Sequence, residues 1–121
     1  MNKCTQDFLA NLAGLFSPIL STHQETIDYW GAEEPPITIA FADVGRCIVQ
    51  TFNEMDSPTR AAIFDRIETG MKSDDEQLGT AVATGLVEAI VGHAARLGNW
   101  EMIRTDLRPV TRKHADAWHT C

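Results

Sequence analysis

The chain has 121 residues, 44% of them hydrophobic and 22% charged, which is enough apolar material for one domain to bury a core without disulfides or metals. This composition argues against an intrinsically disordered chain. The net charge is −7, and residues 1–95 contain 14 acidic and 5 basic side chains. This excess of negative charge argues against a nucleic-acid ligand and favours a basic partner.

Apolar residues at helical spacing predict two helices before residue 32. The apolar face of the first helix is formed by Phe8, Leu12, Leu15 and Phe16. Ser17 and Pro18 predict an N-cap followed by proline at the first helical position of a second helix, which ends near Gly31. Its apolar side is formed by Ile19, His23, Ile27 and Trp30. Residues 33–36 are expected to be a stiff linker because they contain two prolines.

More helices are predicted after the linker. A third, at about 37–55, has a single apolar stripe, formed by Ile37, Phe41, Val44, Ile48, Phe52 and Met55. Asp56–Ser57–Pro58 starts a fourth helix. Residues 73–76, Ser-Asp-Asp-Glu, form an acidic connection that can cap a fifth helix, which Gly98 closes. A short sixth helix is broken by Pro109, and a last piece begins at about residue 111. No segment reads as a convincing strand, so we predict an all-α fold, a single compact helical bundle of five to seven helices over residues 1–121.

The fifth helix, residues 78–97, is the most apolar stretch and contains two ionisable side chains, Glu88 and His93. On a regular helical wheel they are about 140° apart, so they cannot form an acid–base pair on one helix face. Glu88 is expected on the wet side, or else partly buried with an arginine or backbone partner. His93 lies within the apolar arc and is expected to bond a backbone carbonyl, as is His23 on the second helix.

The spacing of the cysteines and the hydropathy of the chain predict the cellular compartment. Cys4, Cys47 and Cys121 have no repeated spacing, which is typical of reduced thiols in a cytosolic protein. No stretch reaches about 18 uninterrupted apolar residues, and the apolar segment 8–20 has no cleavage-site pattern. We therefore expect a soluble cytoplasmic protein with no membrane partner.

No spacing predicts a catalytic or metal site. The C-terminal residues His114, Asp116, His119 and Cys121 resemble a ligand set, but the two histidines are five residues apart and do not align on a helix face. We expect this segment to be a frayed tail anchored by Trp118. His23 and His93 could meet, but no third ligand is predicted. We therefore predict no metal, no cofactor and no enzymatic activity; the alternative is an enzyme that uses Glu68, Glu88 and histidines around a metal.

The acidic surface is the remaining candidate for a functional site. Five side chains on the third helix and in the connections are candidates for partner binding: Asp43, Glu54, Asp74, Asp75 and Glu76. The alternative is a merely solvated surface with no dedicated partner.

Two stretches resemble a known class of proteins. Residues 63–90, IFDRIETGMKSDDEQLGTAVATGLVEAI, join an acidic connection to a small-residue helix, and residues 108–119 read RPVTRKHADAWH. Both are similar to sequences of small, acidic, helical bacterial immunity proteins of toxin-delivery systems, including contact-dependent growth inhibition. The resemblance covers about the C-terminal half of the chain, and no contact residue is transferred from it.

The resemblance implies a stoichiometric inhibitor that binds a cognate protein toxin, a basic nuclease in many cases, with the acidic surface acting as a phosphate mimic. The chain itself would be a monomer or weak homodimer. The alternative is a helical regulatory or scaffolding module that self-associates or binds another cellular protein.

Overall fold

The structure, a computed structural model, describes residues 1–120, and Cys121 lies outside the described residues. Those residues form helices and no strand, which confirms the predicted all-α fold. The helices are α1 (Lys3–Ala13), α2 (Ser17–Trp30), α3 (Ile37–Gln50), α4 (Ser57–Met71), α5 (Glu76–Thr80), α6 (Glu88–Leu97), α7 (Trp100–Arg104) and α8 (Pro109–His119). A 3-10 turn, η1 (Phe52–Glu54), precedes α4, and a π-helical segment, η2 (Ala81–Val87), joins α5 to α6 in one continuous helix.

Two of the predicted helix starts are confirmed at their caps. The Asp56 carboxylate accepts the N–H of Thr59 at 2.9 Å and starts α4. Asp75 accepts the N–H of Leu78 at 2.9 Å and starts α5. These bonds use backbone donors that the first helical turn leaves without an internal partner.

Other predicted boundaries are wrong by one to several residues. The cap of α2 is Phe16, which makes no side-chain cap bond, so Ser17 is the first helical residue instead of the cap. The third helix ends at Gln50 and not near residue 55, because the chain tightens into η1. The guanidinium of Arg60 holds this turn by donating two hydrogen bonds, at 2.8 and 3.1 Å, to the carbonyl of Phe52.

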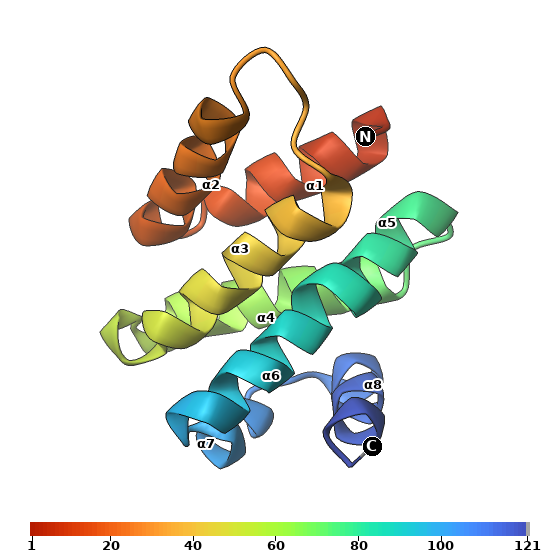
Figure 1. Cartoon of the computed structure of the whole chain (residues 1–121). Helices are drawn as coiled ribbons and strands as arrows, with labels where there is room; N and C mark the ends of the chain where they lie inside the picture. The colour runs from red at the N-terminus through yellow and green to blue at the C-terminus, as the bar shows by residue number, and fades with distance from the viewer. Residues whose placement is uncertain (121) are drawn as a thin grey trace.

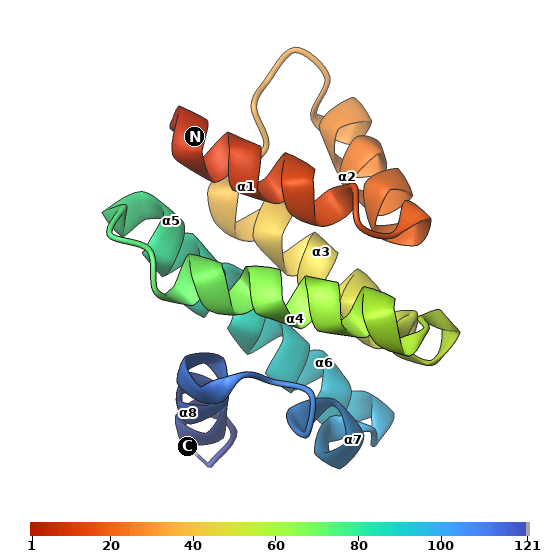
Figure 2. The same cartoon turned by 180° about the vertical axis from the view of Figure 1, so that it is seen from behind.

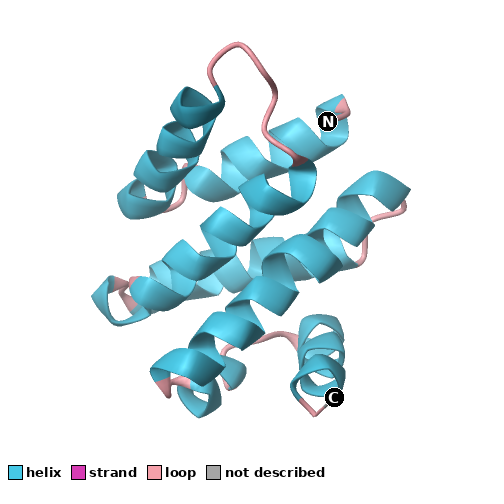
Figure 3. Ribbon diagram, in the orientation of Figure 1, coloured by secondary structure: helices cyan, strands magenta, loops and turns pink. Residues whose placement is uncertain are grey.

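The helices form two layers (Figure 1). Helix α3 and the continuous helix α5–η2–α6 lie side by side and run in the same direction, and α1 and α4 cover them from behind (Figure 2). Helix α2 lies at the edge of the molecule and packs on α1 and α3, whereas α7 and α8 lie at the other end (Figure 3). One core of buried side chains connects the layers, with Phe41, Ile48, Phe64, Leu86 and Ile90 among its fully buried members.

Glycines allow a close contact between α3 and the continuous helix. A methyl group at Gly45 would lie 2.8 Å from the carbonyl oxygen of Leu86. A methyl group at Gly85 would lie 2.8 Å from Cβ of Phe41. The backbones therefore approach within a distance that a methyl group at either position does not permit.

The π segment rotates the second half of the continuous helix relative to the first. A π-helix has more residues per turn than an α-helix, so over seven residues the side-chain direction falls behind by roughly a third of a turn. Ile90, Val91 and Ala94 therefore face the core, and His93 moves to its flank, where it is only half-buried. The predicted position of His93 in the middle of the apolar arc is wrong for this reason.

The C-terminal segment is a docked helix, so the predicted frayed tail is wrong. Thr111 and Ala115 are the buried residues of α8, and Trp118 is 47% exposed. Glu68 of α4 accepts the N–H groups of Val110 and Thr111, both at 2.9 Å, and thereby caps the first turn of α8. Because the capping carboxylate is 42 and 43 residues away in sequence, local spacing could not predict it.

Charge pairs complete the docking of α8. Arg108 contacts Asp65 of α4 at 2.7 Å, and Arg104 binds Asp116 with two bonds of 2.8 Å. The basic C-terminal end thus uses two of its cations against carboxylates of its own chain. The last helix begins at Pro109, two residues before its predicted start.

By length and composition alone, one helix, Glu76–Leu97, could cross a membrane. Half of its most apolar window is buried inside the molecule, and the core helix of a soluble protein passes the same test. The predicted absence of a membrane span and the predicted cytoplasmic location stay predictions.

Candidate functional site

The five acidic residues predicted to bind a partner do not gather on one surface. Asp43 lies in α3 and Glu54 in η1 before α4, whereas residues 74–76 lie where the chain passes from α4 to α5. Helix α4 has 15 residues and is about 22 Å long. Figures 1 and 2 show its two flanking connections at opposite ends of the molecule. A partner surface centred on all five residues would have to span this length.

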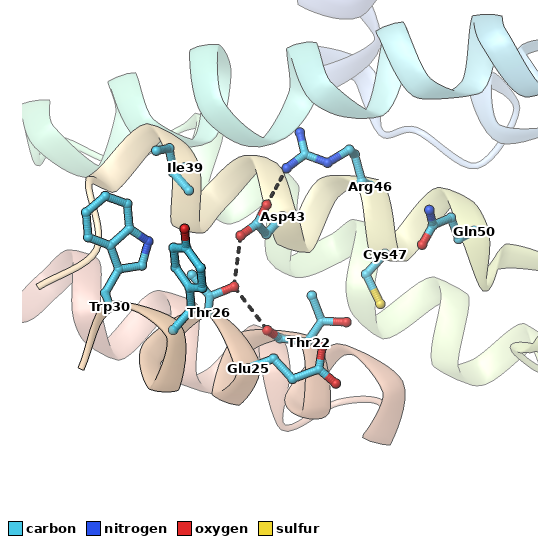
Figure 4. A pocket seen from close by; sticks show the side chains of 10 residues that line it. Thr22, Glu25, Thr26, Trp30, Ile39, Asp43, Arg46, Cys47 and Gln50 are labelled. Carbon is cyan, nitrogen blue, oxygen red and sulfur yellow. Dashed lines mark hydrogen bonds and ion pairs between the residues drawn. The ribbon is translucent and has the colours of Figure 1, made fainter.

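Asp43 is engaged within the protein. Its carboxylate forms an ion pair with Arg46, one turn further along α3. The hydroxyl of Thr26 on α2 donates a 2.8 Å hydrogen bond to the same carboxylate (Figure 4). The side chain is 26% exposed. Asp43 therefore ties α2 to α3 and presents only part of its charge to solvent.

Asp75 also has an internal role. In addition to capping α5, it accepts the side-chain amide of Asn2 at 3.2 Å on each carboxylate oxygen. The pKa of Asp75 is lowered, first by the backbone hydrogen bond from Leu78 and then by the bond from Asn2. Asp74 and Glu76 beside it are exposed, as is Glu54. Sequence reasoning could not separate the carboxylates used as caps from those that face solvent.

A groove of about 700 Å³ runs between α2 and α3. Its lining residues come from both helices: Thr22, Glu25, Thr26, Tyr29, Trp30, Ile39, Asp43, Arg46, Cys47 and Gln50. Figure 4 shows Trp30 and Ile39 toward one end and Cys47 and Gln50 toward the other, with the Thr26–Asp43 bond between them. Cys47 is buried, and its thiol lies 3.5 Å from the carbonyl oxygen of Pro18.

Exposed apolar side chains distinguish this groove. Tyr29 is 84% exposed, and its ring meets that of Trp30 edge-on with centroids 5.9 Å apart. Ile39 on the facing helix is 41% exposed. Aromatic residues are enriched at protein interfaces because they bury a large area at a small entropic cost. Sequence reasoning missed Tyr29, because the helical pattern of α2 does not show which of its polar sides borders a groove.

The groove is lined by two carboxylates, Glu25 and Asp43, and by one cation, Arg46. Residues 4–45 contain six carboxylates and no lysine or arginine. Glu25 and Asp28 are exposed on α2. The first cation after this stretch is Arg46, which is already paired with Asp43. Because Arg46 pairs with Asp43, Glu25 is the charged residue of the groove lining that has no ion-pair partner there.

The histidines do not assemble a metal site within residues 1–120, where no group of three or more potential ligands gathers. Burial lowers the pKa of His23, and burial followed by the charges of Arg96 and Arg46 lowers the pKa of His93. Neither ring bonds the backbone carbonyl predicted for it. A buried ring nitrogen of each, Nδ1 of His23 and Nε2 of His93, has no hydrogen-bond partner among the described residues.

Glu88 is half-buried, so its predicted place on the wet side is wrong. Its carboxylate oxygen Oε2 lies 3.1 Å from Nε2 of His114 on α8. The predicted partner was an arginine or the backbone, whereas the observed partner is a histidine of α8, 26 residues away in sequence. Glu68, the other carboxylate of the enzymatic alternative, caps α8 instead. Burial acts to raise the pKa of Glu68, but hydrogen bonds from Thr111 and Val110 outweigh burial, so the pKa is lowered.

Comparison of the chain with protein-family models, with curated proteins and with solved structures found no match. The resemblance to immunity proteins therefore rests on residues 63–90 and 108–119 alone.

Proposed function

We propose that this chain is an immunity protein of a toxin-delivery system, which binds a basic cognate toxin domain and neutralises it by stoichiometric binding. The observation that carries the proposal is the groove between α2 and α3, where an 84% exposed tyrosine stands among carboxylates. An exposed aromatic anchor on a protein of net negative charge suits binding of an oppositely charged protein, since the field steers association and the ring supplies contact area.

The net charge of −7 supports the same partner chemistry. A nuclease toxin carries cations for its phosphate substrate, so an acidic protein can occupy the same surface. Association with such a toxin is expected to slow as salt is raised, because salt screens exposed charges beyond about 10 Å at 0.1 M. Glu54, Asp74 and Glu76 contribute to this field as exposed carboxylates.

The test uses the gene that adjoins this one. The variable C-terminal domain of an exported protein encoded there is expressed in cells with and without this chain, and growth and complex mass are measured. Restored growth and a one-to-one complex by light scattering support the proposal. Failure of the folded chain to restore growth or to form the complex overturns it, as does the lack of such a neighbouring gene in the genome that carries the chain.

A second candidate is a helical module that self-associates. Exposed apolar side chains near the C-terminal end favour it: Leu97, Met102 and Trp118. Light scattering of the purified chain distinguishes the two functions, because an obligate dimer supports self-association and a monomer at micromolar concentration contradicts it.

A further inference from the structure

Helix α2 lies at the edge of the molecule (Figure 1). It packs on α1 and α3 and contributes only Ile19 and Thr26 to the buried residues. The side opposite the core is left without a helix of its own to cover it (Figures 1 and 2). On the side of α2 that faces the groove, Tyr29 is almost fully exposed.

The dimensions of this side suit another helix. Helix α2 has 14 residues and is about 21 Å long, which corresponds to roughly four turns of a partner helix lying beside it. Helix-in-groove recognition places the apolar face of an amphipathic helix between two helices, with anchors spaced at three and four residues. Trp30 and Ile39 at one end of the groove can receive such an anchor (Figure 4).

Charge decides what kind of helix fits. The acidic side chains of α2 are Glu25 and Asp28, and α2 contains no lysine or arginine. In a twofold contact between two copies, the same patch meets itself, so these carboxylates would face each other. Repulsion of like charges therefore disfavours a second copy, and a cationic partner helix is complementary.

We propose that the groove between α2 and α3 is the docking site for a basic amphipathic helix of the protein partner, whose apolar face packs on Tyr29, Trp30 and Ile39. Its lysines or arginines pair with Glu25 in the groove lining and with Asp28, which is exposed on α2 outside that lining. This inference rests on the proposed function and adds the place of contact and the chemistry of the contacting segment. Asp43, held by Thr26 and Arg46, keeps α2 and α3 at the spacing that the groove requires.

The probe is a fluorescent helical peptide of about 18 residues, with leucines on one face and lysines on the other, matched by a peptide with glutamates in place of the lysines. Binding to the full chain is followed by anisotropy. The lysine peptide is expected to bind and the glutamate peptide is not. Tyr29→Ala is expected to weaken binding about tenfold, as for an interface anchor. Trp118→Ala, at an exposed aromatic residue on α8, is the control and leaves binding unchanged.

General attraction of a basic peptide to an acidic protein is separated by a pair of charge variants. The double variant Glu25→Gln with Asp28→Asn and the control Asp74→Asn with Glu76→Gln remove the same net charge. Only the first is expected to weaken binding several-fold beyond the effect of net charge. Equal losses in both, absence of binding by the lysine peptide, or equal binding of the glutamate peptide overturn the proposed site.

The same variants in the growth assay distinguish this inference from the proposed function. Loss of protection with Tyr29→Ala, but not with Trp118→Ala, supports both. If the unaltered chain protects cells and Tyr29→Ala protects them equally, the docking site is overturned while the proposed function stands. A dimer of the purified chain that Tyr29→Ala dissociates also overturns the site, because the groove would then receive a second copy.

Discussion

Replacement of Gly45 by alanine tests the close contact between α3 and the continuous helix. The added methyl would lie 2.8 Å from the carbonyl oxygen of Leu86, whereas ordinary contact begins at 3.4 Å. That oxygen belongs to the backbone, so the two helices must separate. Overpacking of this kind costs about 1–3 kcal/mol, and the better helix propensity of alanine returns up to about 1 kcal/mol. We expect a net loss of about 1–2 kcal/mol in the free energy of unfolding.

The assay is thermal or urea unfolding, with Gly92→Ala as the matched control on the partner helix. For 121 residues the expected loss corresponds to a Tm lowered by about 4–8 °C. A methyl at Gly92 meets nothing closer than the Arg96 guanidinium at 3.7 Å, so its propensity gain should raise the Tm by about 2–4 °C. If Gly45→Ala is as stable as Gly92→Ala, the close approach does not control packing and the reasoning is refuted.

Three further predictions concern stability. The folded-state pKa of both His23 and His93 is lowered from 6.5, so the unfolded chain binds more protons as pH falls below 6.5. Their contribution is present above pH 6.5 and is lost as pH falls through the folded-state pKa values. Replacing both by Gln should therefore reduce the loss of unfolding free energy that occurs as pH falls below 6.5. Glu68→Ala removes the cap of α8 and should cost about 1–2 kcal/mol, with faster amide exchange in α8. Arg60→Lys keeps the charge but loses the two hydrogen bonds to the Phe52 carbonyl and the guanidinium contact, 4.1 Å from the centre of the Phe52 ring. The free energy of unfolding, measured with urea, is expected to fall by about 1 kcal/mol.

Each of these predictions has an outcome that contradicts it. An unchanged pH slope in the double histidine variant would mean that neither ring is penalised by burial. Exchange in α8 that stays as slow in Glu68→Ala as in the unaltered chain would mean that the pairs of Arg104 and Arg108 suffice to hold the helix. An Arg60→Lys chain of full stability would show that one ammonium donor supports η1 as well as the guanidinium does.

Most of the local structure could be predicted because its causes are local. The caps at Asp56 and Asp75 and the end of the long helix at Gly98 follow from residues within a few positions of each boundary. The apolar stripe of α3 likewise gives its buried face, since a regular helix repeats its side-chain direction. The π segment breaks that regularity, which is why the wheel misplaced His93.

The candidate site was predicted less well than the fold. Of the five acidic residues, the structure joins Asp43 to Arg46 and Thr26 and uses Asp75 as a cap, so two of them serve the fold itself. An acidic side chain has the same sequence signature whether it caps a helix or faces a partner. Tyr29 was missed because a helical pattern does not show which side of a helix at the edge of the molecule is left uncovered.

The sequence by itself determined an all-α chain, the approximate limits of its helices and its acidic character, because spacing, capping and charge are properties of neighbouring residues. Only the tertiary structure decided which side chains from distant segments meet. The cap of α8 by Glu68, the contact of Glu88 with His114 and the groove beside Tyr29 all join residues of different helices. Such contacts depend on how whole helices pack, and helix packing is set by the combined shape of many side chains.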